Sequence, residues 1–248
     1  MQLFEDPPPA LGEPIAAGRT ADIYPLPDGW VLRRYRTDVG NVEREAAAAR
    51  LAVAGGVPTP EVREARGHDM VLRRVDGPTM VDAFASGAIG AEDGAQILAD
   101  LHRACHAVRR PSGDASGLRD ISEPGTPEDQ KVLLHLDLHP LNVMLGADGP
   151  MLIDWANASW GPAGVDEAMT VLILSVVVLN NTLGIAEPAR RMLSAFIDAA
   201  GDPRPCLEAA IAARRTYTHP SQEELRVLPE ITNLARSLGP VPGRPAVT

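Results

Sequence analysis

Residues 135–142 read His-Leu-Asp-Leu-His-Pro-Leu-Asn, and Ile-Asp-Trp follows at 153–155. We expect Asp137 and Asn142 to bracket a tight loop between two short strands, and Asp154 to stand at the end of a third strand. Asp154 comes twelve residues after Asn142. This arrangement can bring a carboxylate, an amide oxygen and a second carboxylate together at one cleft.

These three side chains suit phosphoryl transfer with a divalent metal. Amide and carboxylate oxygens are ligands that Mg²⁺ accepts, and the ion keeps its remaining positions for water and phosphate. The pattern gives this role to Asn142 and Asp154. The other carboxylate, Asp137, is left free to orient a hydroxyl group and to take its proton. This is the division of labour in kinase-type phosphoryl transfer.

The spacing resembles the catalytic loop of protein kinases and the metal-binding Asp that follows it. The form His-x-Asp-x-His-Pro-x-Asn, with Ile-Asp-Trp in place of Asp-Phe-Gly, is similar to the aminoglycoside phosphotransferase and choline kinase-like small-molecule kinases. This resemblance covers residues 12–166. It implies an α+β, bilobal protein-kinase-like fold, with ATP and Mg²⁺ as cofactors and a small molecule as the phosphate acceptor.

The chain pattern is consistent with two lobes. Residues 1–75 are expected to form a nucleotide-binding lobe with a small antiparallel β-sheet and one helix, and residues 76–248 a larger catalytic and substrate-binding helical lobe. Segment 110–130 is polar, with Gly and Pro, and reads as a loop. The predicted strands are 15–17, 22–25, 30–35, 62–65, 69–73, 131–134, 143–145 and 151–153, and the predicted helices are 42–54, a stripe over 97–108, 166–182, 187–200, 204–216 and 221–237.

The resemblance implies a phosphate-binding turn and an ion pair in the first lobe. The turn is Gly18-Arg19-Thr20, whose backbone N–H groups would point at phosphate. It has one glycine where protein kinases use three, so on its own it would be taken for an ordinary hairpin turn. Arg33 stands where the family has a lysine, and Glu45 would hold it. Arginine is always charged and grips phosphate in a bidentate way, but it is longer and planar.

Other first-lobe residues would contact the nucleotide base. By the resemblance, Val31 lies over the adenine on the same strand face as Arg33, and Leu72 lies beside it. The backbone of Arg73 and Val75 would hydrogen-bond the adenine edge. Two alternatives to a phosphate-binding Arg33 stay open. In one, Arg34 binds the phosphates instead; in the other, Arg33 is solvated and does not bind them.

Three histidines and one carboxylate are expected to support the site without taking part in the chemistry. His102 is expected to pack in the core, while His135 and His139 brace the loop. Asp166 matches an acidic residue that follows the metal-binding Asp in this family, and we expect it to cap a helix and to steady the loop.

Charge bears on the acceptor. The formal net charge is −10. Residues 1–75 contribute −1 and residues 76–248 contribute −9. The acidity is unlike that of a nucleic-acid-binding protein. It is either a solvated surface or an attraction for a cationic acceptor, such as an aminoglycoside or amino alcohol, with a neutral sugar as the alternative.

Cysteine use and hydropathy suggest a cytoplasmic protein with no membrane partner. We expect it to be a monomer or a weak homodimer. Cys105 and Cys206 lack metal-ligand spacing, and thiols in a reducing compartment are the default. The N-terminus has no signal-peptide pattern. The apolar run 171–179 is too short to span a bilayer and predicts a buried helix.

Two other classes of function remain open. A nucleotide-binding pseudokinase is suggested by Arg33, although all three metal and base positions are filled. A protein kinase is disfavoured because residues 155–165 leave little room for an activation segment.

Overall fold

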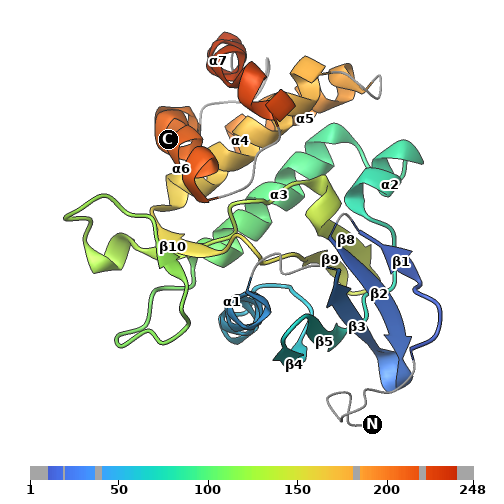
Figure 1. Cartoon of the computed structure of the whole chain (residues 1–248). Coiled ribbons are helices and arrows are strands. Elements are labelled where there is room, and N and C mark those ends of the chain that lie inside the picture. The colour runs from blue at the N-terminus through green and yellow to red at the C-terminus, as the bar shows by residue number, and fades with distance from the viewer. Residues whose placement is uncertain (1–10, 19, 37–40, 181–184, 218–221, 239–248) are drawn as a thin grey trace.

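The computed structural model describes residues 11–18, 20–36, 41–180, 185–217 and 222–238. Within these ranges, an antiparallel sheet with helix α1 beside it occupies one end of the molecule, and the remaining helices gather at the other end (Figure 1). This arrangement confirms the predicted α+β fold class.

The N-terminal sheet has five strands in the order β1-β2-β3-β5-β4, and every neighbouring pair is antiparallel. The central strand, β3, carries the residues predicted to meet the nucleotide. The strands are β1 (Ala16–Ala17), β2 (Ala21–Leu26), β3 (Trp30–Tyr35), β4 (Val62–Arg66) and β5 (Asp69–Arg73).

Helix α1 (Val42–Ala54) covers part of this sheet and contacts β4 and β5. The Asn41 side chain accepts a hydrogen bond from the N–H of Arg44 at 2.8 Å, which caps the helix start. The buried face consists largely of alanine, whose small side chain favours the helix and allows close approach to the sheet. This packing brings Glu45, on the same face, toward β3.

A short linker leads from β5 toward the helical part. It passes close to strand β8 (Val143–Gly146), because the N–H of Leu145 donates to the carbonyl of Pro78 at 2.9 Å. Gly77 is needed here: its φ is 151°, and a Cβ at this position would lie 2.1 Å from the carbonyl oxygen of Leu145. Any side chain would therefore push the linker away from β8.

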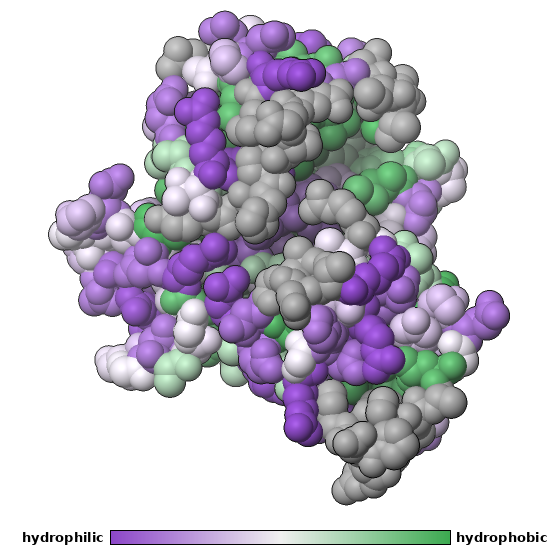
Figure 2. Space-filling model, in the orientation of Figure 1, coloured by the Kyte–Doolittle hydropathy of each residue, from purple (hydrophilic) through white to green (hydrophobic). Residues whose placement is uncertain are grey.

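The helical part is built around α4, which contacts α3, α5, α6 and α7. By length and composition α4 could cross a membrane, but 56% of its residues are buried, as in the core helix of a folded domain. On the face shown in Figure 2, hydrophilic side chains predominate and hydrophobic ones form small patches. The helices are α2 (Met80–Ala85), α3 (Ala91–His106), α4 (Ala163–Asn180), α5 (Ala186–Ala199), α6 (Leu207–Tyr217) and α7 (Gln222–Ser237).

Two small sheets frame the loop at 135–142. In one of them, β7 (Val132–Leu134) pairs with β10 (Ser159–Gly161), which also pairs with β6 (Arg119–Asp120). In the other, β8 pairs with β9 (Gly149–Leu152).

Most predicted elements are present, with shifts of up to three residues at their ends, except that α3 begins at Ala91, six residues before the predicted stripe over 97–108. Residues 181–182 and 221 of the predicted helices lie outside the described residues. The sequence analysis missed α2, which has six residues, β6, which has two, and β10, which has three. Elements this short show almost no periodicity of apolar residues. Segment 110–130, predicted as a loop, contains β6 and a 3₁₀ turn at Glu128–Gln130. The predicted helix at 204–216 begins with a 3₁₀ turn, Arg204–Cys206. The lobe boundary at residue 75 stays a prediction.

Candidate active site

The buried carboxylate of Asp166 binds the backbone of the loop that follows β7. Asp166 accepts the N–H of His135 at 3.0 Å and the N–H of Leu136 at 2.7 Å. Leu136 has a left-handed backbone with φ of 59°, which is costly for a branched side chain and needs such support. The prediction that Asp166 steadies the loop agrees with these bonds. The prediction that it caps a helix is wrong, since α4 begins at Ala163 and Asp166 lies inside its first turn.

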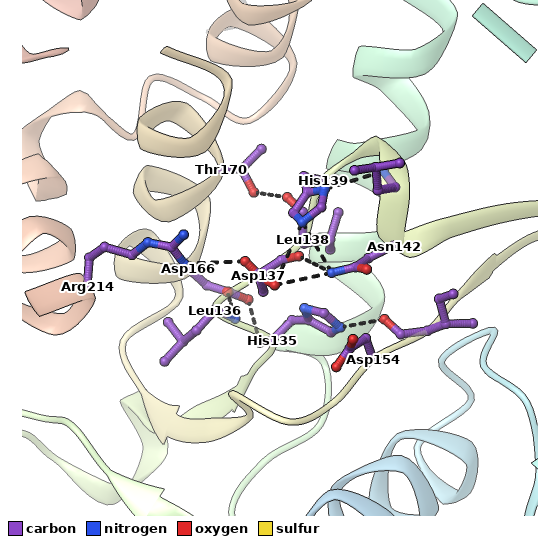
Figure 3. Close-up of polar contacts among 12 residues, drawn as sticks. His135, Leu136, Asp137, Leu138, His139, Asn142, Asp154, Asp166, Thr170 and Arg214 are labelled. Carbon is purple, nitrogen blue, oxygen red and sulfur yellow. Dashed lines mark hydrogen bonds and ion pairs between the residues drawn. The ribbon is translucent and has the colours of Figure 1, made fainter. Parts of the chain in front are cut away.

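Asp137 is the next residue of this loop, and Asn142 and His139 lie beside it (Figure 3). The Nδ2 of Asn142 donates to the Asp137 carbonyl at 2.9 Å and lies 3.3 Å from Asp137 Oδ2. Nδ2 also lies 3.3 Å from His139 Nε2, and the amide oxygen of Asn142 lies on the side away from Asp137 (Figure 3). The metal-ligand role of Asn142 stays a prediction.

Both ring nitrogens of His139 have neighbours within the loop. Its Nδ1 accepts the N–H of Leu141 at 3.3 Å, and its Nε2 lies 3.3 Å from Asn142 Nδ2. That Nε2 lies 3.7 Å from Asp137 Oδ2. Burial raises the pKa of Asp137, but His139 and the charge of Arg214 outweigh it and lower the pKa to about 2. Asp137 is therefore a carboxylate at neutral pH.

Asp154 lies next to this loop because two backbone segments are joined. The N–H of Ile153 donates to the carbonyl of Asn142 at 2.9 Å, and the Nε2 of His135 contacts the carbonyl of Ile153 at 3.1 Å. Asp154 itself has φ of 69°, another left-handed residue. The two predicted metal ligands, Asn142 and Asp154, are thus brought together, and His135 braces the loop as predicted.

Arg33 connects the N-terminal sheet to Asp154. Its Nη1 donates to Glu45 Oε1 at 2.6 Å and its Nη2 donates to Asp154 Oδ2 at 3.1 Å. The Arg33 side chain is 13% exposed and that of Glu45 is 4% exposed. Burial lowers the pKa of Arg33, but the charges of Glu45 and Asp154 raise it further, so the guanidinium stays charged. The structure thus brings together Arg33 and Glu45, which the sequence analysis paired.

Arg34 points to a different partner. It forms a two-pronged contact with Asp69, at 2.7 Å from Nε and 2.6 Å from Nη2. Successive side chains of a strand face opposite sides of the sheet, so Arg34 lies on the side away from Asp154. The alternative assignment of the phosphate-binding role to Arg34 therefore lacks geometric support.

The residues predicted to contact adenine share one patch of the sheet. Val31 and Leu72 are direct cross-strand partners on β3 and β5, on the same face as Arg33. The N–H of Arg73 donates to the carbonyl of Glu61 at 2.9 Å. The backbone contact predicted between Arg73 and adenine would therefore use the carbonyl of Arg73. Val75 lies in the linker beside Gly146.

The predicted phosphate-binding turn is described only in part. The N–H of Gly18 donates to the carbonyl of Ala21 at 2.8 Å, which closes a tight connection between β1 and β2. The prediction that this N–H points at phosphate is therefore wrong for Gly18, and for Thr20 it stays a prediction. Gly18 is exposed and Thr20 is half-buried. Arg19 lies outside the described residues.

Four polar residues at the site were missed by the sequence analysis. Arg214 of α6 places Nη1 at 3.3 Å from Asp137 Oδ1, and Tyr35 donates its hydroxyl to Glu45. His106 contacts Asp166 at 3.1 Å, and Thr59 accepts the indole N–H of Trp155 at 2.9 Å. Only Tyr35 gave a usable signal, because it lies two residues after Arg33 and so faces the same side of its strand.

His102 is buried as predicted, but it also takes part in a polar cluster. Its Nε2 contacts Thr170 Oγ1 at 2.9 Å and its Nδ1 lies 3.3 Å from Asp166 Oδ2. Burial raises the pKa of Asp166, but the two histidines beside it, His102 and His106, lower it well below the usual range. The support under the loop is therefore an ionised carboxylate.

Comparisons with known proteins bear on this site. Residues 114–209, which include the loop, Asp154 and Asp166, match the model of the phosphotransferase enzyme family, APH. No curated protein sequence matches the chain significantly.

Solved structures match over nearly the whole chain. A thermostable mutant of aminoglycoside phosphotransferase APH(4)-Ia, in a ternary complex with AMP-PNP and hygromycin B, has a TM-score of 0.57 at 15% identity, covering 91% of this chain and 92% of that one. A choline/ethanolamine kinase family protein from Mesorhizobium loti has a TM-score of 0.53 at 15% identity, covering 94% and 89%. The macrolide 2'-phosphotransferase MphH from Brachybacterium faecium has a TM-score of 0.50 at 20% identity, covering 94% and 92%.

At these identities the structural matches establish the fold, and the family match covers the segment with the conspicuous polar residues. Both agree with the resemblance drawn from the sequence. The chain therefore has the protein-kinase-like fold of these phosphotransferase structures, and its residues 114–209 match the phosphotransferase enzyme family.

Proposed function

We propose that this protein transfers the γ-phosphate of ATP to a hydroxyl group of a small molecule in a reaction that needs Mg²⁺. One observation carries the proposal: Asp137, Asn142 and Asp154 meet at a single site, and Arg33 reaches that site from the sheet. Structures of this fold have been described with AMP-PNP or ADP bound.

Each residue has a separate task in this proposal. Asp137 orients the acceptor hydroxyl and takes its proton. Because its pKa is low, Asp137 is an ionised carboxylate at neutral pH and can accept that proton. Arg33 binds the α- and β-phosphates, and Glu45 holds Arg33 in place. The face formed by Val31 and Leu72 packs against the adenine.

The donor set fits a magnesium ion. The amide oxygen of Asn142 and the carboxylate of Asp154 are hard oxygen donors, and the Asn142 amide is already oriented by its bond to Asp137. When bound, Mg²⁺ neutralises charge on the phosphates and on the transferred group. The chain contributes positioning and charge, and forms no covalent bond to the phosphoryl group.

The acceptor class is a finer question. The net charge of residues 76–248 favours a cationic acceptor, and a neutral sugar is the alternative. The similar structures differ among themselves: one holds hygromycin B, one is described as a choline/ethanolamine kinase family protein and one as a macrolide phosphotransferase. They support a small molecule with a hydroxyl group and leave its charge open.

Two other functions are weaker candidates. A pseudokinase that binds nucleotide without turnover is suggested by the replacement of the usual lysine with Arg33. Against it, the proposed base and metal positions hold two carboxylates and an amide, whereas a decayed site would be expected to lose one of them. A protein kinase is disfavoured because α4 starts at Ala163, leaving only residues 155–162 after the metal-binding segment.

The experiment is a transfer assay with γ-³²P-labelled ATP, Mg²⁺ and a panel of aminoglycosides, amino alcohols and sugars. Labelled acceptor is expected with at least one class, together with one ADP for each phosphate transferred. Calorimetry with Mg-AMP-PNP runs in parallel. Nucleotide binding without transfer to any acceptor would favour the pseudokinase, and absence of nucleotide binding would exclude both.

A further inference from the structure

Arg214 approaches Asp137 from the helical part of the chain. It lies on α6, and its Nη1 contacts Asp137 Oδ1 at 3.3 Å. Asn142 contacts the same residue through the carbonyl and Oδ2. In Figure 3 the two side chains reach Asp137 from opposite sides. The two oxygens of Asp137 therefore face different surroundings: Oδ2 faces the proposed metal ligands and Oδ1 faces α6.

The acceptor has to come close to Arg214. A hydroxyl that gives its proton to Asp137 must lie within about 3 Å of one of its oxygens. The nucleotide phosphates, by the proposed function, occupy the side of Asn142 and Asp154. The acceptor therefore enters toward α6, where the Arg214 guanidinium lies within a few ångströms of the hydroxyl-bearing carbon.

Arg214 is held in this place rather than extended into solvent. Its side chain is 13% exposed and that of Asp137 is 23% exposed. A guanidinium that is partly shielded from water interacts more strongly with a nearby charge than an exposed one does. A guanidinium also has planar donors whose geometry matches a carboxylate or a phosphate.

This local charge opposes the expectation drawn from the whole second lobe. The net −9 is spread over residues 76–248, and salt screens exposed charges beyond about 8–10 Å. The charge of Arg214 acts at contact distance from the reacting group. Asp137 offsets this charge in the resting site, but once it has taken the hydroxyl proton the charge of Arg214 is left uncompensated by it. An ammonium group on the acceptor would then face a like charge, whereas an oxyanion would gain a charge-assisted hydrogen bond.

We propose that Arg214 is an acceptor-binding residue and that the acceptor carries an oxyanion, a carboxylate or a phosphate, close to the hydroxyl that is phosphorylated. The inference rests on the proposed function, because it uses the position of Asp137 as the base. It replaces the cationic acceptor with an anionic one.

Matched compounds test the charge preference. One set is D-glucose, D-glucosamine, D-glucuronate and D-glucose 1-phosphate, and the other is glycerol, serinol, glycerate and glycerol 3-phosphate. Each set keeps one carbon framework and changes the charged group. The readout is the concentration of each compound that half-maximally changes Mg-ATP consumption in either direction. This readout detects both substrates and compounds that only occupy the site.

Oxyanion members are expected to act at concentrations at least about tenfold lower than neutral or ammonium members of the same set. Comparing carboxylates with phosphates then identifies which oxyanion is preferred. In Arg214→Ala the oxyanion advantage should fall below about threefold. Arg215→Ala is the matched control, since Arg215 is the exposed neighbour on the same helix, and it should keep the advantage.

Three results would overturn the inference: an equal or better effect of the ammonium members, an oxyanion preference that survives in Arg214→Ala, or no effect of any oxyanion member. Calorimetry with Mg-AMP-PNP on the same preparation separates this failure from a failure of the proposed function. If the nucleotide binds, only the acceptor inference is lost. If it does not bind, the proposed function is lost as well.

Discussion

The Nη2 of Arg33 lies 3.1 Å from the Oδ2 of Asp154, although 121 positions separate them in the chain. The residue predicted to bind phosphate thus touches a residue predicted to bind the metal. Because the other end of the guanidinium is held by Glu45, Arg33 bridges two carboxylates. A lysine has one nitrogen and cannot span them in the same way.

Arg33→Lys is therefore expected to weaken nucleotide binding, even though it restores the residue that the family uses. Loss of a charged hydrogen bond in a partly buried site costs about 1–3 kcal/mol. Calorimetry with Mg-AMP-PNP measures the change. Arg34→Lys is the matched control, because Arg34 contacts Asp69 on the other side of the sheet, and its nucleotide affinity should stay near that of the wild type.

A gain in affinity or turnover in Arg33→Lys would contradict this account and support a decayed lysine site, as in the pseudokinase alternative. An unchanged affinity would mean that Arg33 does not contact the phosphates.

Asp154→Asn should act through the metal. The substitution removes the negative charge that would attract Mg²⁺ but keeps the size of the side chain. Affinity for Mg-ATP should fall, and excess Mg²⁺ should restore part of the activity. Titrations of activity against Mg²⁺ give the half-saturating concentration in each protein. A half-saturating concentration equal to that of the wild type would count against Asp154 as a ligand.

Asp166→Asn should destabilise the loop. Both oxygens of Asp166 accept backbone N–H groups in the buried core, and an amide nitrogen in place of one oxygen would face an N–H without accepting it. We expect a loss of at least about 2 kcal/mol in the free energy of unfolding, measured in urea. Asp148→Asn, at the turn between β8 and β9, is the control and should change stability little. Equal stability of both variants would refute the support role.

Stability should fall between about pH 7 and pH 5 because of His102 and His135. Burial lowers the pKa of each below the ordinary value of 6.5. In this range the unfolded chain binds a proton that the folded chain does not, so acid favours unfolding. Asp166 acts separately: its pKa is well below 3.8, so its contribution is present above that value and is lost only at lower pH.

Urea midpoints at several pH values measure this slope. His102→Gln should reduce it and leave the part that His135 contributes, whereas His68→Gln, at an exposed position, should leave it unchanged. A slope that is the same in wild type and His102→Gln would rule out His102 as one of its sources.

The sequence predicted much of the fold and the centre of the site, and the reasons are physical. Helix 42–54 carries a run of alanine between an Asn cap and Gly55, so local propensity and end signals agree. Asp137, Asn142 and Asp154 lie within 18 residues of chain, and short strands on either side leave few ways to arrange them. Arg33 and Glu45 were paired through the family resemblance, since nothing in their local sequence joins them.

The remaining features depend on tertiary packing. Arg214 meets Asp137 across 77 positions, and no spacing rule connects residues of α6 with a loop so far away. Asp166 looked like a helix cap because the helix start is marked only weakly, by Pro162 and glycine rather than by a capping side chain. The strands β6 and β10 are two and three residues long. They form through pairing, β6 with β10 and β10 also with β7.

The most direct test of the central claim is Asp137→Asn, measured for both Mg-AMP-PNP binding and ADP formation from Mg-ATP. Since Asp137 acts on the hydroxyl and not on the nucleotide, the dissociation constant should stay within about twofold while the rate falls by at least about 10²-fold. With its pKa at about 2, Asp137 is ionised from about pH 5 to pH 9, so the loss should be the same across that range. Retention of the wild-type rate of ADP formation in Asp137→Asn would contradict the assignment.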